Sequence, residues 1–198
     1  MFNSNSYTSA FILVLLTLLV FPISSDSQTV SPAPGSRNNH CAFAYQNRFY
    51  VYGGVGNDLT NSFFSYIETP FSTDKPNWVA MPVAGAANVS RPACSVTSDG
   101  ILYTTGGAYS NELKFTGIQA FDLNKGTSGS WYTPKTTGLD TVKNLLYRDS
   151  HRSIVVKTSL GDEFMFIFGG EQSNDTYILN AKNLTWETVP KGVSMQMQ

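Results

Sequence analysis

Short apolar segments separated by turn residues fill the chain from residue 37 onward. Residues 164–168 are apolar at five consecutive positions, as expected for a strand that is covered on both faces. Gly, Pro, Asn and Asp mark the breaks between segments. The pattern predicts three groups of four strands, at 40–46, 48–53, 62–67 and 77–81; at 93–97, 101–106, 117–122 and 130–133; and at 151–158, 163–169, 175–180 and 184–189.

Three markers recur in the same order in each group. An arginine leads the group, the second predicted strand ends in a diglycine, and a tryptophan follows. The diglycines lie at intervals of 53 and 63 residues, and the chain has no other tryptophans, so the order indicates an internal repeat. The markers are Arg37, Gly53, Gly54 and Trp78; Arg91, Gly106, Gly107 and Trp131; and Arg148, Gly169, Gly170 and Trp186.

On these markers the chain resembles kelch repeats, whose period is about 50 residues. The resemblance implies an all-β, kelch-type β-propeller like the central domain of galactose oxidase, with four antiparallel strands in each blade. The blades would cover about 37–82, 91–133 and 148–190. In each blade the glycines would permit positive φ at a strand end, and the tryptophan would cover the gap to a neighbouring blade.

Three blades are fewer than the four to eight of closed propellers, so the sequence predicts a partial propeller with two uncovered blade faces. We expect one of two explanations. The residues are a piece of a longer polypeptide, or a homodimer completes the ring.

The composition agrees with a folded all-β chain of 198 residues. Hydrophobic residues make up 41% and aromatic residues 13%, while charged residues make up only 14%. Lys and Arg number 13 against 14 Asp and Glu, and no basic run is present. Nucleic-acid binding is therefore not expected, because it depends on neutralising phosphates.

The N-terminal residues predict export. Residues 10–21 form an uninterrupted apolar run of signal-peptide length, although residues 1–9 carry no Lys or Arg. We predict a signal peptide at 1–27, a linker at 28–36 and a tail at 191–198. An uncleaved signal anchor in the membrane is the alternative.

A signal peptide indicates a secreted or cell-surface protein. In such a protein, Asn-x-Ser/Thr sequences accept glycans. Three such sequences lie in predicted turns. The acceptors would be Asn88, Asn174 and Asn183.

The two cysteines, Cys41 and Cys94, form an even set in an oxidising compartment. Counted from the leading arginine they fall at the fourth and third positions, so strand alternation points them to opposite faces of their blades. Adjacent blades meet through opposite faces, which allows a disulfide between the blades. Two buried free thiols are the alternative.

The histidines His40 and His151 follow their leading arginines at the spacing of Cys94 after Arg91. They would be metal ligands around the central axis or, as the repeat favours, structural residues at the start of a strand. The sequence lacks the tyrosine, histidine and cysteine set of the galactose oxidase copper site and the common hydrolase and nucleotide motifs. We therefore expect no catalytic residue, no metal and no cofactor.

The leading arginines Arg37, Arg91 and Arg148 have two interpretations. They would form a cationic mouth for acidic peptides or glycans, or each would stabilise its own blade. The preferred function is a noncatalytic secreted module that binds proteins or surface glycans through loops on one face. The alternative is a galactose-oxidase-like oxidoreductase whose metal site would lie in missing blades.

Overall fold

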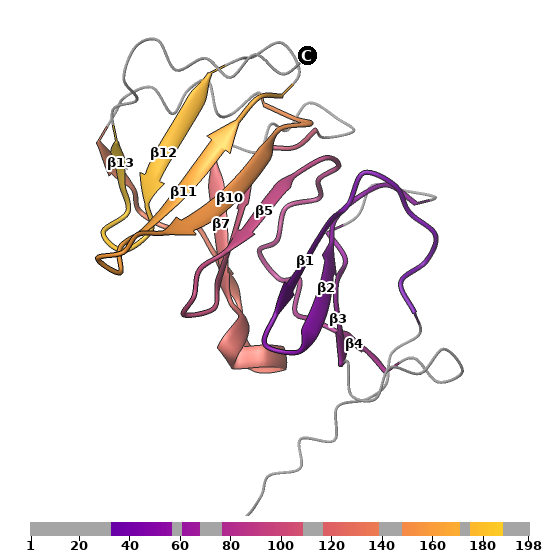
Figure 1. The fold of residues 1–198 in the computed structure, drawn as a ribbon. Helices are drawn as coiled ribbons and strands as arrows, with labels where there is room; N and C mark the ends of the chain where they lie inside the picture. Colours follow the sequence, from indigo (N-terminus) through magenta and orange to yellow (C-terminus); the bar gives the residue numbers. More distant parts are fainter. Residues whose placement is uncertain are drawn as a thin grey trace, which may run out of the picture.

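The computed structural model describes residues 33–56, 61–67, 77–108, 117–138, 148–170 and 175–187. These residues form three sheets that follow one another along the chain (Figure 1). The all-β, partial-propeller prediction is confirmed, since each sheet is one blade. The predicted signal peptide, the sequon at Asn174 and the predicted tail lie outside the described residues.

Blade 1 contains β1 (Cys41–Tyr45), β2 (Arg48–Tyr52), β3 (Phe63–Ile67) and β4 (Trp78–Ala80), paired antiparallel in chain order. A two-residue turn joins β1 to β2. Its residues Gln46 and Asn47 have φ of 42° and 44°, the positive values that match the twist of a tight hairpin.

Blade 2 contains β5 (Ala93–Val96), β6 (Ile101–Thr105), β7 (Ile118–Asp122) and β8 (Trp131–Tyr132), again paired in order. The 3₁₀-helix η1 (Leu123–Ser128) connects β7 to β8, in the interval between the predicted strands 117–122 and 130–133. The helix begins because the Asp122 side chain accepts a hydrogen bond from the Asn124 backbone N–H.

Blade 3 contains β10 (Arg152–Lys157), β11 (Glu163–Phe168), β12 (Thr176–Asn180) and β13 (Thr185–Glu187). A short strand that precedes them in the chain, β9 (Thr137–Gly138), adds a parallel fifth strand beside β13. The twelve predicted strands are all present within two residues of their predicted ends. Among the strands that the structure describes, β9 alone was not predicted, because its two residues carry neither periodicity nor a repeat marker such as Trp131 of β8.

Two apolar clusters fill the seams between blades. Trp131 of blade 2 packs against Tyr52 and Phe63 of blade 1, with ring centroids 4.7 and 5.4 Å away. Trp186 of blade 3 belongs to a second cluster that includes Tyr103 of blade 2. The innermost strands β1, β5 and β10 lie side by side, so the blades fan out from one edge (Figure 1).

The strand registers correct one sequence alignment. The residue just before each diglycine pairs with Cys41 in blade 1, Ala93 in blade 2 and Arg152 in blade 3. The position before these partners holds His40, Pro92 and His151. Cys94 therefore does not share the histidine slot, since β5 starts two residues after Arg91, whereas β1 and β10 start four residues after Arg37 and Arg148.

Each outer blade keeps one sheet face that no other described sheet covers. On blade 3, Ile154 and Val156 are 53% and 43% exposed. On blade 1, Phe49 is exposed and Trp78 is half-buried. Among the described residues, no helix is long and apolar enough to cross a membrane.

Candidate functional site

The blades have two ends that differ in chemistry. The diglycine end holds the three diglycines and the segments that lead into each blade. The hairpin end holds the turns β1–β2, β5–β6 and β10–β11. Turns at the ends of rigid strands are the usual places for binding residues, so both ends are candidates.

At the diglycine end, the first two diglycines each hold the chain that enters the next blade. The Gly54 N–H donates to the Val89 carbonyl at 2.8 Å, and the Gly107 N–H donates to the Arg148 carbonyl at 2.9 Å. A Cβ on Gly54, which has φ of +96°, would lie 2.6 Å from the Asn38 oxygen. The diglycine is thus needed for both its conformation and its close backbone contact.

Arg37 and Arg148 make the same contact in their blades. Nη1 of Arg37 donates to the Gly53 carbonyl at 3.3 Å, and Nη1 of Arg148 donates to the Gly169 carbonyl at 2.7 Å. Arg148 is only 1% exposed and lies over the Tyr177 ring. Burial lowers the pKa of the Arg148 guanidinium. The Arg148 side chain therefore cannot contribute to a cationic mouth that faces solvent unless the blade rearranges.

Arg91 has a different partner. Its Nη2 lies 3.0 Å from Oδ2 of Asp149, which belongs to the segment leading into blade 3. The ion pair thus links the entries of blades 2 and 3. The three arginines occupy separate sites: two stabilise the diglycine of their own blade and one bridges a seam.

His151 is buried in the seam between blades 2 and 3, where its Nε2 lies 2.8 Å from Oγ1 of Thr105. Burial, and then the charge of Arg148, lower the pKa of His151 to about 4. The imidazole is therefore neutral at physiological pH. His40 is exposed. The part of the chain that the structure describes contains no cluster of three or more His, Cys, Asp or Glu residues that could hold a metal ion.

The two seams differ at their innermost strands. Cys41 of β1 and Cys94 of β5 form a disulfide across the first seam, with Cα atoms 6.0 Å apart. Across the second seam, Oγ of Ser95 and Oγ of Ser153 form a hydrogen bond of 2.6 Å. Only the first seam is covalently linked among the described residues.

At the hairpin end, a pocket of about 330 Å³ lies between blades 2 and 3. Three turns build it: the β5–β6 turn, the β10–β11 turn and the β12–β13 turn. Asp99, Glu163 and Lys182 are its charged residues. The lining is completed by Thr97, Ser98, Ile101, Tyr103, Gly161 and Ala181.

The pocket's carboxylates are held in place by its own turns. Both oxygens of Glu163 accept the Ser98 backbone N–H, at 3.0 and 3.1 Å, and one oxygen of Asp99 accepts the Thr97 hydroxyl. Burial, then the nearby Tyr132 and Asp99, raise the pKa of Tyr103 to about 12. The phenol is therefore neutral at physiological pH.

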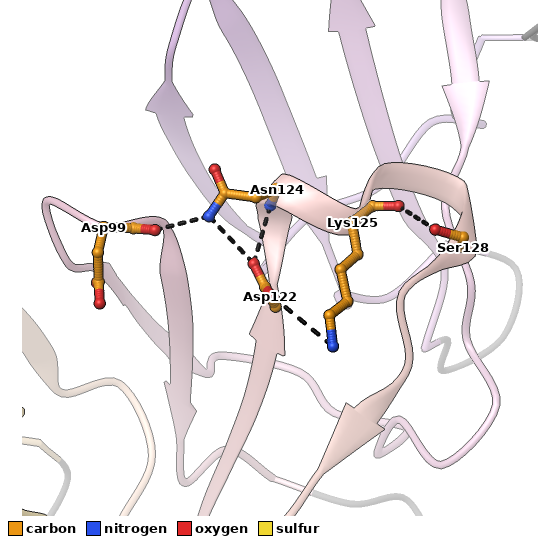
Figure 2. Close-up of polar contacts among 5 residues, drawn as sticks. All are labelled: Asp99, Asp122, Asn124, Lys125 and Ser128. Carbon is orange, nitrogen blue, oxygen red and sulfur yellow. Dashed lines mark hydrogen bonds and ion pairs between the residues drawn. The ribbon is translucent and has the colours of Figure 1, made fainter. Parts of the chain in front are cut away.

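A polar network continues the hairpin end from this pocket toward blade 1. Asn124 of η1 donates through Nδ2 to the Asp99 carbonyl at 2.6 Å and to Oδ1 of Asp122 at 3.1 Å (Figure 2). Its Oδ1 accepts the Tyr45 hydroxyl of blade 1 at 3.0 Å. The Lys125 ammonium lies 3.9 Å from the Asp122 carboxylate (Figure 2). The network fixes the Asp99 turn, which lines the pocket.

Two of the predicted glycan acceptors lie in described segments. Asn88 is exposed in the connection from β4 to β5, and Asn183 is exposed in the turn from β12 to β13. Both therefore have room for a glycan.

The pocket was not predicted from the sequence. Its residues come from turns of two different blades, and the Ser98 to Glu163 hydrogen bond spans 65 positions. The sequence offers one signal for the pocket: the turns at the ends of the strands opposite the diglycines must lie together in neighbouring blades.

Comparisons with known proteins agree with the repeat. A family model described as the KLHDC2/KLHL20/DRC7 kelch-repeats domain matches residues 23–196. The human Multiple epidermal growth factor-like domains protein 8 is 24% identical over 83% of this chain and 6% of its own length. The Arabidopsis thaliana Acyl-CoA-binding domain-containing protein 5 is 28% identical over 82% of this chain and 25% of its own length. The chain thus spans a quarter or less of these relatives.

Proposed function

Because this chain belongs to the kelch-repeat family, we propose that it is a noncatalytic module that binds a segment of another protein. The observation that supports this function is the hairpin-end pocket between blades 2 and 3. A concave site that combines apolar surface with a few fixed polar groups is the usual form of a recognition site.

The lining indicates which segment would fit. Ile101 and Tyr103 offer apolar surface, while Asp99 and Glu163 place two carboxylates beside it. A Lys or Arg side chain matches both features, since its stem packs on apolar surface and its head pairs with carboxylates. Lys182 at the same pocket would disfavour a second cation and favour an acidic or amide neighbour in the partner segment.

A peptide array tests this function. Peptides that carry Lys or Arg should bind, and Asp99→Asn should weaken them about fivefold, because an exposed charge pair contributes about 1 kcal/mol. Glu187→Gln is the matched control, since Glu187 lies in β13 and does not line the pocket. If the peptides bind the Asp99→Asn and Glu163→Gln variants as tightly as they bind the unaltered chain, the result would contradict this binding site.

We also propose that the chain is exported and N-glycosylated, and that it binds surface glycans as well as proteins. The support is the apolar run at 10–21 and the exposure of Asn88 and Asn183. Expression in a secreting eukaryotic host should give a product in the medium whose mass falls on treatment with an N-glycosidase. Asn88→Gln should remove one glycan, and an unchanged mass would contradict glycosylation there. Glycans printed beside the peptides on the array test the second ligand class.

The oxidoreductase alternative gains no support from the comparisons. In the residues that the structure describes, both cysteines are joined in the disulfide and His151 is held by Thr105.

A further inference from the structure

The two seams follow one positional rule. Residues one and three places before each diglycine face the next blade, as Tyr50 and Tyr52 do in the first seam and Tyr103 does in the second. Residues two and four places before it face the previous blade, as Met165 and Ile167 do. Both seams are therefore built from the same pair of sheet faces.

The free face of blade 3 is the face that would meet a next blade. Phe166 and Phe168 stand three and one places before Gly169, and they are half-buried. Ile154, which pairs with Phe166, and Val156 lie on the same face and are largely exposed. This face repeats the positions that Tyr50 and Tyr52 occupy in blade 1.

The free face of blade 1 is the face that would meet a previous blade. Phe49 stands four places before Gly53, and Trp78 occupies the fourth-strand position at which Trp131 fills the first seam. On the innermost strand this face presents Ala42 and Ala44, which are exposed. These small residues leave room for the large Ile154 and Val156 side chains on the free face of a blade 3.

We propose that a second copy of this chain covers both faces, with blade 3 of each copy packed on blade 1 of the other. The two contacts are identical by twofold symmetry, so no free face of this kind is left in the pair. Each contact repeats the pairing of faces that the two internal seams already show. Six blades also lie within the range of closed propellers.

The mass of the full chain in solution, measured by light scattering after size-exclusion chromatography, tests the pairing. The unaltered chain should have twice the single-chain mass. Phe166→Glu, which puts a charge on the free face of blade 3, should reduce it to the single-chain mass. Leu160→Glu is the matched control, since Leu160 is 89% exposed in the β10–β11 turn, and it should leave the mass doubled.

A cross-link tests the geometry independently of any destabilisation by Phe166→Glu. Relative to the diglycines, Arg152 is at the position of Cys41, and Ala42 is at the position of Cys94. Chains with Arg152→Cys mixed with chains with Ala42→Cys should form a disulfide-linked pair under mild oxidation. Chains with Leu160→Cys should not link to Ala42→Cys. A single-chain mass for the unaltered protein, or equal linking of both mixtures, would overturn the proposal.

Discussion

Arg37 and Arg148 offer a direct measurement of what burial adds to one repeated contact. Both donate to the first carbonyl of their diglycine, but only Arg148 is fully buried. We consider Arg37→Met and Arg148→Met, because methionine keeps most of the stem and removes the guanidinium. The variants should differ strongly in stability.

The magnitude follows from the contacts of Arg148. Its Nη1 donates to the carbonyls of Gly169 and Asp175, each at 2.7 Å, and hydrogen bonds from charged groups contribute about 1.5–3 kcal/mol each. Removing the buried charge offsets part of the free energy lost with these hydrogen bonds, because burial opposes the charged form of Arg148 and lowers its pKa. Asp175 is 57% exposed and stays solvated, so no buried charge is stranded. We expect a net loss of about 2–3 kcal/mol.

Arg37 makes a longer bond of 3.3 Å and is half-buried, so its loss should cost about 0.5 kcal/mol. Urea unfolding monitored by tryptophan fluorescence measures both values, and the Arg148→Met midpoint in heat should fall by roughly 5–10 °C. Equal losses for the two variants would refute the reasoning that burial sets the strength of this contact.

Three further outcomes are expected. Because the pKa of His151 falls to about 4 on folding from an ordinary 6.5, the unfolded chain binds more protons, so stability should be complete above about pH 6.5 and decline toward pH 4; His151→Gln should flatten that decline in urea titrations. The disulfide closes a separation of 53 residues, so Cys94→Ser should lower the free energy of unfolding by about 4 kcal/mol, and alkylation of both cysteines in the denatured, unreduced chain would show that no bond had formed. Gly54→Ala should destabilise far more than Gly161→Ala in thermal unfolding, because both have positive φ but only Gly54 is crowded; similar melting temperatures would contradict the crowding argument.

The strands could be predicted from the sequence because their signals are local. Apolar runs, turn residues and the diglycine each act within a few positions, and the structure keeps β2, β6 and β11 within one residue of expectation. The small β9 could not be predicted, since its pairing with β13 depends on a contact 48 residues away.

The roles of the arginines and histidines depended on register and burial, which spacing alone does not reveal. Arg91 precedes Cys94 by three positions and Arg148 precedes His151 by three, yet Arg91 forms a half-exposed ion pair and Arg148 is buried. Proline at position 92 takes the slot that holds histidine in the other blades. The pocket was hidden for a related reason, since its walls belong to two different blades.

The single disulfide makes the molecule unevenly stiff. Blades 1 and 2 are joined by a covalent bond at their innermost strands, whereas blades 2 and 3 are joined there by a serine pair. Thermal opening should therefore occur mainly at the second seam, while blades 1 and 2 move together as a unit. Because the hairpin-end pocket straddles that second seam, opening of the seam should widen the pocket, and a segment bound there should hold blades 2 and 3 together.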